Sequence, residues 1–250
     1  MSAKTAVVLA AGMGTRMKSD LPKVLVEVCG RPMILYVLDA LAAGGIERTI
    51  VVVGYRAELV RQILKDRPGV EFALQAEQLG TGHAVMCCRD LLAEYDGPVM
   101  VVAGDSPLMR AESVAALLAE YERRPAAAIL GTAHKPNPHG LGRVVRDEQG
   151  EFIGIVEEKD ATDEQRKITE VNLSYYVFNC RDLLLTLDQL RSDNAQGEYY
   201  ITDSPGVLVA QGREVRALPV LQPCEALTIN TFDQLALVEA EMTPPSQLPV

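Results

Sequence analysis

The chain has 250 residues, 48% of them hydrophobic, which is enough to bury the core of one large α/β domain. Its 24 basic and 34 acidic side chains give a formal net charge of −10, so we expect neither a nucleic-acid polymer nor an anionic membrane as a partner, because both would repel it. The five cysteines are odd in number and lack metal-ligand spacing, which favours reduced thiols in a cytoplasmic protein.

Strand-like and helix-like segments alternate through the first half of the chain. Residues 5–10 form a short apolar run ended by glycine, typical of a strand buried on both faces and too short to cross a membrane. The following segments are helix 32–43, strand 49–53, helix 57–64, strand 71–74, helix 82–91, strand 99–103, helix 112–122 and strand 126–132. This alternation predicts an α/β fold with a Rossmann-like, mostly parallel sheet flanked by helices.

The pattern changes after residue 139. Segments 142–146 and 151–156, joined by the turn DEQG, predict a hairpin, and residues 174–178 form another β-rich run. The remaining segments are helix 181–190, helix 204–211, strand 215–220 and helix 231–242, followed by a proline-rich tail at 243–250. We therefore expect a smaller β-rich subdomain beside the main sheet.

The loop after the first strand, VLAAGMGTRMKSDLPKVL (residues 8–25), is unusual in an acidic protein. Residues 1–31 carry five basic and two acidic side chains, a local charge of +3. Glycines in such a loop let backbone N–H groups approach phosphate oxygens. The dinucleotide fingerprint is excluded because Met17 occupies its third glycine position, and the Walker A motif because no glycine directly precedes Lys18. The alternative is a tight turn with solvated cations.

This loop resembles the signature of the sugar-1-phosphate nucleotidylyltransferases. The matching positions are Leu9, Ala10, Ala11, Gly12, Gly14, Thr15, Arg16 and Met17, then Leu21, Pro22 and Lys23. Later motifs arrive in the order expected for the bacterial N-acetylglucosamine-1-phosphate uridylyltransferases: QAEQLGTGHA (75–84), GDSPL (104–108), GLGRVV (140–145), GIVEEKDATDEQR (154–166), NAQGEYYITD (194–203) and TIN (228–230). The resemblance covers residues 5 to about 241. It implies an enzyme that converts UTP and N-acetylglucosamine 1-phosphate to UDP-N-acetylglucosamine and pyrophosphate with Mg²⁺.

The resemblance also implies a role for each matching residue. Arg16 would grip the leaving phosphates and Lys23 would bridge the phosphates of both substrates, as the catalytic residues. The implied nucleotide-binding residues are Leu9, Ala10, Ala11, Gly12, Gly14, Gln75, Gly80 and Thr81. The implied sugar-binding residues are Gly140, Glu157, Asn172, Tyr199 and Thr202. Asp105 and Asn230 would be the Mg²⁺ ligands.

Some of these residues also have simpler interpretations. Asp105 follows a buried strand at the sheet edge where ligands of open α/β folds collect, but an aspartate before Pro107 could equally cap a turn. Thr81 could simply start the following helix, and Glu157 could be an ordinary solvated charge. The three histidines are scattered, and we assign them no acid, base or metal role.

The sequence departs from the family pattern beside the implied substrate contacts. Ala103 stands where the family usually has tyrosine, Leu141 where it has tyrosine, and Leu173-Ser174 where it has threonine and glycine. The implied phosphate and metal positions are intact, so one alternative is a nucleotidylyltransferase for another sugar 1-phosphate, including one that uses dTTP. A second alternative is a non-catalytic nucleotide-sugar-binding module.

The resemblance further suggests how the chain is divided. We expect one nucleotidylyltransferase domain at 1–242, with a nucleotide-binding part at about 1–135, a sugar-binding part at 136–230 and a C-terminal helix at 231–242, before the tail at 243–250. The family's second half is a β-helix that acetylates glucosamine 1-phosphate and holds the trimer. No hexapeptide repeat of that type is visible, so we expect neither acetyltransferase activity nor a β-helix trimerisation domain in this chain.

Overall fold

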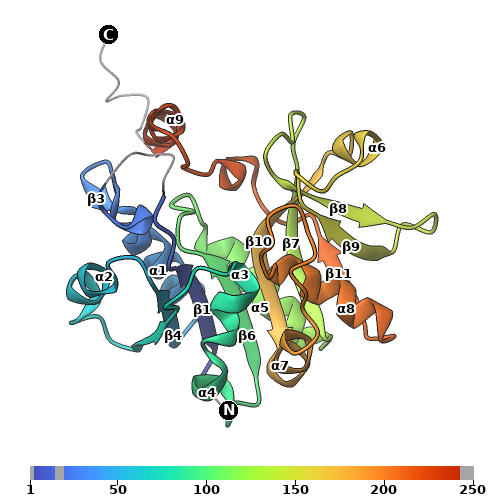
Figure 1. Ribbon diagram of the computed structural model, residues 1–250, viewed down its shortest axis with the longest axis horizontal. Coiled ribbons are helices and arrows are strands. Elements are labelled where there is room, and N and C mark those ends of the chain that lie inside the picture. The colour runs from blue at the N-terminus through green and yellow to red at the C-terminus, as the bar shows by residue number, and fades with distance from the viewer. Residues whose placement is uncertain (1–2, 15–19, 243–250) are drawn as a thin grey trace.

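A nine-stranded sheet with helices on both faces dominates the structure, a computed structural model that describes residues 3–14 and 20–242 (Figure 1). Its main path runs β11-β7-β10-β6-β1-β4-β5. The strands β1 (Thr5–Ala10), β4 (Arg48–Val53), β5 (Val70–Leu74) and β6 (Pro98–Ala103) are all parallel. The predicted α/β fold with a mostly parallel sheet is confirmed.

One antiparallel strand interrupts this order. The strand β10 (Glu170–Asn179) pairs antiparallel with β6 on one side and with β7 (Ala128–His134) on the other. Beyond it, β7 pairs in parallel with β11 (Val215–Leu218). Most of β10 is buried, because apolar side chains fill both of its faces. The strand is ten residues long, whereas the sequence predicted only residues 174–178.

The predicted hairpin is present and is an extension of the main sheet. The strands β8 (Gly142–Arg146) and β9 (Phe152–Val156) pair antiparallel, and β8 also pairs with the start of β10 at Val171 and Asn172. The turn is closed by the Gly150 N–H, which donates to the Asp147 carbonyl over 3.0 Å. The hairpin and helix α6 (Asp163–Arg166), which the sequence analysis did not predict, project together from the sheet (Figure 1).

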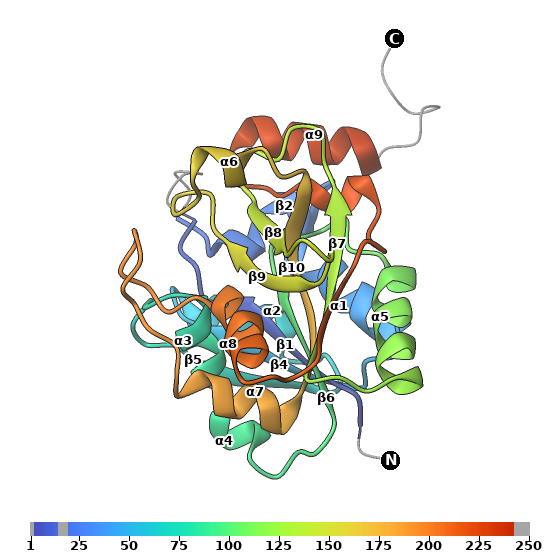
Figure 2. The same cartoon turned by 90° about the vertical axis from the view of Figure 1, so that its right-hand side faces the viewer.

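Helices cover the two faces of the sheet over separate apolar cores (Figure 2). One face carries α1 (Met33–Ala43), α2 (Ala57–Leu64) and α5 (Ala111–Arg123). The other carries α3 (Thr81–Met86), α4 (Arg89–Leu92), α7 (Cys180–Leu187) and α8 (Ser204–Ala210). The single helix predicted at 82–91 is wrong, because the backbone leaves the helix at Cys87 and Cys88 and a new turn begins at Arg89.

The C-terminal helix α9 (Phe232–Met242) returns to the N-terminal half of the molecule (Figure 1). Val238 packs in a small apolar cluster with Val28 and Met33, next to the two-stranded sheet of β2 (Glu27–Val28) and β3 (Arg31–Pro32). The Cys29 N–H donates to the Glu239 carboxylate over 2.9 Å. This docking brings the residues just before α9 close to the loop that follows β1.

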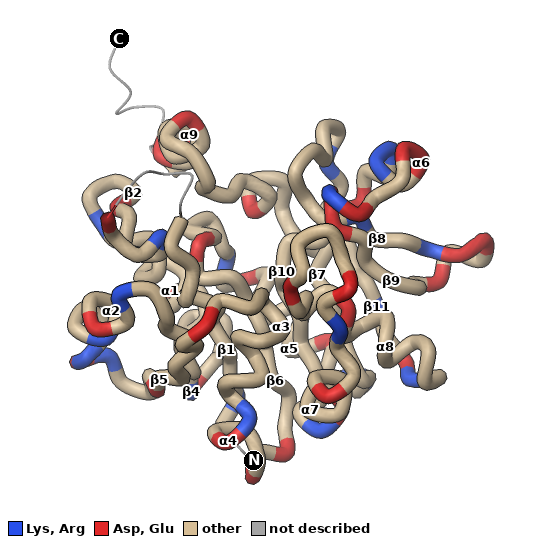
Figure 3. Tube along the Cα trace, in the orientation of Figure 1, with Lys and Arg blue, Asp and Glu red and all other residues tan. Residues whose placement is uncertain are grey.

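Charged residues of both signs are spread along the chain, with a short acidic stretch at the β8–β9 turn and residues of both signs at α6 (Figure 3). Within the described part of the chain, no helix combines the length and apolar character needed to cross a membrane.

Candidate active site

The carboxyl ends of β1 and β6 lie side by side and carry two loops to the same edge of the sheet. Leu9 is in register with Ala103, and the Gly104 N–H donates to the Leu9 carbonyl over 2.9 Å. Gly14 has a φ of +68°, and a Cβ there would lie 2.8 Å from the Cβ of Lys23. Glycine is therefore required at residue 14 for the loop to fold back on itself. Arg16 lies outside the described residues.

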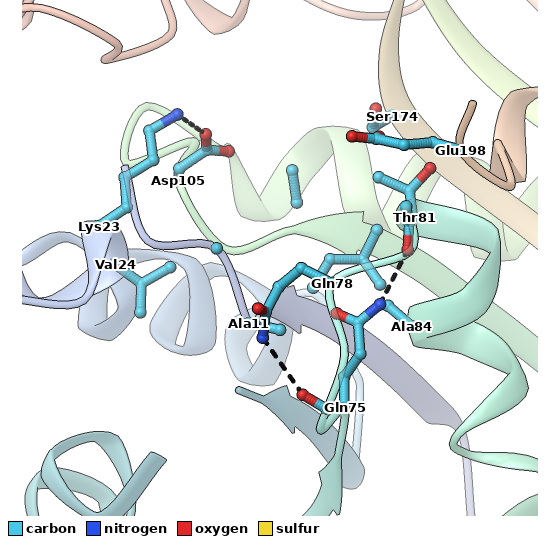
Figure 4. Close-up of a pocket in the computed structure, with 14 residues that line it drawn as sticks. Ala11, Lys23, Val24, Gln75, Gln78, Thr81, Ala84, Asp105, Ser174 and Glu198 are labelled. Atoms are coloured by element: carbon cyan, nitrogen blue, oxygen red, sulfur yellow. Dashed lines mark hydrogen bonds and ion pairs between the residues drawn. The ribbon is translucent and has the colours of Figure 1, made fainter. Parts of the chain in front are cut away.

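Three predicted residues from distant parts of the chain converge at this edge. The Lys23 ammonium donates to a carboxylate oxygen of Asp105, and to Oδ1 of Asn230 over 2.8 Å. The side chains of Lys23 and Asp105 are only 14% and 23% exposed. Figure 4 shows Lys23 reaching across to Asp105 at one end of a cavity. The short helix at residues 23–25 presents the lysine, and the docking of α9 fixes the segment that carries Asn230.

A cavity of about 330 Å³ opens between the β1 loop and α3. Six of the predicted nucleotide-binding residues line it together with Lys23 and Asp105: Leu9, Ala11, Gly12, Gln75, Gly80 and Thr81. The other two do not line it, since Ala10 is buried in the sheet and Gly14 supports the turn against Lys23. One wall of the cavity therefore consists of backbone and small side chains at Ala11 and Gly12. Another wall carries the Gln75 amide and the Thr81 hydroxyl.

The wall at residues 75–81 is fixed by hydrogen bonds to a distant segment. The buried Gln75 amide donates to the Gly80 carbonyl over 3.0 Å and contacts Nδ1 of His83 at 3.1 Å. Gly80 has a φ of +106°, and a Cβ there would lie 2.5 Å from the Tyr199 carbonyl oxygen. Oγ1 of Thr81 accepts the Ile201 N–H over 3.0 Å, so this hydroxyl has a structural role at the start of α3.

A second cavity of about 260 Å³ adjoins the first and contains three of the predicted sugar-binding residues, Gly140, Glu157 and Asn172. Asn230 also lines this cavity. The two cavities share Ala103, Asp105 and Ser174, so they meet where Lys23 and Asp105 pair. Tyr199 and Thr202 line neither cavity; Tyr199 supports the first one through its backbone, which bonds to Leu79 and Gly82.

The polar groups of the second cavity are partly desolvated. Burial raises the pKa of the Glu157 carboxyl, and the nearby Asp203 and Asp160 carboxylates add to the rise, while the Thr202 hydroxyl opposes it. The buried Asn172 amide donates to the Tyr176 hydroxyl over 2.7 Å. Glu157 is therefore more than a solvated surface charge.

Asp105 and Asn230 together could hold a small, hard cation. They offer a carboxylate and an amide oxygen, the donors that Mg²⁺ prefers, and the Lys23 ammonium already stands between them as a cation. Among residues 3–14 and 20–242 there is no group of three or more His, Cys, Asp or Glu side chains that could hold a metal. Mg²⁺ is usually bound by one or two protein oxygens, with phosphate and water completing the octahedron.

Comparison with known proteins places the chain in a family. Residues 6–200 match the model of the MobA-like NTP transferase domain. The chain belongs to this family. The chain is 47% identical over 235 residues to the bifunctional protein GlmU of Pelotomaculum thermopropionicum and 45% identical over 240 residues to that of Lactococcus lactis. These matches cover 94% and 96% of this chain but 51% and 52% of the relatives, so the chain spans about half the length of those relatives.

A solved structure supports the fold. The crystal structure of a UDP-glucose pyrophosphorylase complexed with UDP-glucose superposes with a TM-score of 0.77 at 16% identity, covering 96% of this chain and 98% of that chain. At this identity the match establishes the architecture, and the residues must carry any argument about substrate.

The structure adds a partly buried ion pair that the sequence analysis did not predict. Arg143, whose side chain is 2% exposed, donates to the Glu158 carboxylate over 2.7 Å, and the same carboxylate oxygen accepts the Gly140 N–H over 3.0 Å. The pair thereby fixes the loop of the NTP transferase domain that lines the second cavity. The only hint in the sequence was an arginine inside a predicted β-strand. Its partner could not be identified, because Glu158 lies 15 residues further along the chain.

Glu225 is a second organising residue that the sequence did not reveal. It is 1% exposed, and its carboxylate accepts four hydrogen bonds. The donors are the Arg110 and Gln222 N–H groups and the Ser113 and Tyr175 hydroxyls, at 2.7–3.1 Å. The short helix that contains Glu225 (Pro223–Ala226) lies just before Asn230, so this carboxylate ties the segment carrying Asn230 to α5 and β10.

Asp203 provides a test of the charges behind the second cavity. Burial, with Asp160 and Asp193 nearby, raises its pKa from 3.8 to about 6. The folded state therefore holds this proton more tightly than the unfolded state, and the resulting stability, complete below about pH 4, is lost as the pH rises through about 6. Asp203→Asn should remove this pH-dependent stability. The difference in melting temperature, variant minus wild type, should therefore increase from pH 4 to pH 7.

Differential scanning fluorimetry across that pH range measures the effect. Asp66→Asn, a change at an exposed residue, is the matched control and should keep the wild-type pH profile. A profile for Asp203→Asn that runs parallel to wild type from pH 4 to pH 7 would contradict the raised pKa.

Proposed function

We propose that this domain transfers a uridylyl group from UTP to N-acetylglucosamine 1-phosphate, releasing pyrophosphate. The observation that carries the proposal is the meeting of Lys23, Asp105 and Asn230 where two adjoining cavities share a wall. One cavity would hold the nucleotide and the other the sugar, as the motifs shared with the sugar-1-phosphate nucleotidylyltransferases suggest.

The reaction requires positioning and charge neutralisation more than covalent help from the protein. An oxygen of the sugar phosphate forms a bond to the α-phosphorus of UTP. The bond from that phosphorus to the oxygen bridging to the β-phosphorus breaks, and the electron pair leaves with pyrophosphate. Lys23 would neutralise charge on the phosphoryl oxygens, and Arg16, which lies outside the described residues, would bind the departing phosphates.

The remaining roles follow from the cavity walls. Gln75 and Gly80 would bind the uracil ring, and Gly12 would offer its N–H to phosphate, since a Cβ there would meet nothing within 4 Å. Glu157 and Asn172 would bind sugar hydroxyls. Asp105 and Asn230 would hold Mg²⁺, and when bound the ion supplies positive charge to the phosphate oxygens.

Product analysis tests the proposal. The protein is incubated with UTP, MgCl₂ and N-acetylglucosamine 1-phosphate, and mass spectrometry is expected to show UDP-N-acetylglucosamine and stoichiometric pyrophosphate. A parallel panel with dTTP and with glucose 1-phosphate tests the sugar and base assignments, because Ala103 departs from the family pattern and borders both cavities. Mg²⁺-independent UTP binding with no turnover on any acceptor would instead support a non-catalytic binding module.

A further inference from the structure

Ser174 has an unusual backbone conformation for its place in the fold. Among the described residues, three non-glycine residues have positive φ: Cys29, Arg56 and Ser174. Cys29 lies in the exposed β2–β3 turn and Arg56 precedes α2, where such conformations are common. Ser174, with φ +60°, lies inside the ten-residue strand β10, where its register with β7 shifts between Asn172 and Tyr175. Extended residues surround it on both sides.

The strained conformation is held in place by the neighbouring side chain. Oδ1 of Asn172 accepts the Ser174 N–H over 3.3 Å, and the Asn172 amide is in turn fixed by the Tyr176 hydroxyl. Asn172 is 5% exposed and Tyr176 is fully buried. A serine in the left-handed conformation is higher in free energy than a glycine in the same place. Such strained residues persist where the surrounding structure fixes their conformation, often at binding sites.

Ser174 also lies where the two cavities meet. Ala103, Asp105 and Ser174 are the residues common to both walls. Ala103 has no polar side-chain atom, and Asp105 offers only acceptor oxygens when ionised. Of the three side chains, the Ser174 hydroxyl is therefore the one that can donate a hydrogen bond to an anionic group. Figure 4 shows Ser174 on the far side of the cavity from Lys23 and Asp105.

We propose that Ser174 is a substrate-contacting residue whose hydroxyl donates a hydrogen bond to a phosphate oxygen between the two cavities. The inference rests on the proposed function, in which the phosphates of UTP and of the sugar 1-phosphate meet between these walls. Lys23 lies on one side of the cavity and would contribute a positive charge. Ser174 lies on the other side and would contribute a neutral hydrogen-bond donor. The left-handed residue lies at the bulge of β10, beside this junction.

Two substitutions separate the hydroxyl from the backbone strain. Ser174→Ala keeps the strain and removes the hydroxyl, whereas Ser174→Gly removes both. We expect the Kd for UTP with MgCl₂ to rise about tenfold in both variants, as expected for a hydrogen bond to a charged group, and kcat/KM for pyrophosphate release to fall by a similar factor. Ser174→Gly should melt at a higher temperature than Ser174→Ala, because glycine adopts φ +60° without strain.

Cys29→Gly and Cys29→Ala provide matched controls at a left-handed residue that borders neither cavity, and both should keep wild-type Kd and kcat/KM. Wild-type Kd and kcat/KM in Ser174→Gly would overturn the inference. A wild-type protein that binds UTP but yields no product would overturn the proposed function alone, since the UTP titrations of the two variants would still decide the role of the hydroxyl.

Discussion

Replacing Lys23 by alanine is expected to lower kcat at least about a thousandfold, equivalent to about 4 kcal/mol of transition-state stabilisation. The ammonium stands between Asp105 and Asn230 at the junction of the cavities, where negative charge accumulates during phosphoryl transfer. Pyrophosphate release under saturating UTP and sugar 1-phosphate measures the loss. Folding should change little, because water can still solvate the partly exposed Asp105 carboxylate.

Lys65→Ala, at the exposed end of α2, is the matched control and should retain wild-type turnover. Lys23→Arg keeps the charge but replaces a compact ammonium with a planar group, so we expect a smaller loss than for alanine. A Lys23→Ala protein that kept more than a tenth of wild-type kcat would contradict the assignment of Lys23 to catalysis.

Glu225→Gln is expected to reduce the free energy of unfolding by about 3 kcal/mol, lowering the melting temperature by roughly 6–12 °C. The glutamate accepts four hydrogen bonds in a site that is 1% exposed. The amide nitrogen of glutamine cannot accept, so one backbone N–H would face another donor and one buried hydroxyl would lose its acceptor. Urea unfolding at pH 7.5 measures the change.

The same variant should raise the Mg²⁺ concentration needed for half-maximal turnover, because the segment before Asn230 loses its anchor. Glu94→Gln, a change at an exposed residue after α4, should leave both stability and Mg²⁺ dependence unchanged. A Glu225→Gln protein with wild-type unfolding free energy would show that the four contacts contribute little.

The fold could be predicted from sequence where hydrophobic patterns are local. The bounds of β1 and α2 agree residue for residue with the predictions, because each is a short apolar or amphipathic segment with clear ends. The direction of β10 could not be predicted, since a strand buried on both faces reads the same in either orientation. The break between α3 and α4 was also hidden, because Cys87 and Cys88 continue the helical apolar pattern.

The candidate site was predictable to the extent that strand ends determine it. Glycine-containing loops after β1 and β6 had to meet at one edge of a parallel sheet, and the structure places Lys23 and Asp105 together there. The φ of Ser174 depends on a register shift in β10, and two of the four contacts of Glu225 join segments more than 100 residues apart. Neither leaves a periodic signal in the sequence.

The antiparallel strand between β6 and β7 also has a consequence for the order of folding. The strands β5, β4, β1 and β6 can form neighbouring pairs as soon as residue 103 is available. By contrast, β7 has no partner until residues 170–179 arrive, and β11 must still add beyond it. The long-range pairing of β10 should therefore limit the refolding rate, and during synthesis the N-terminal half would wait with an open edge at β6 until that strand closes it.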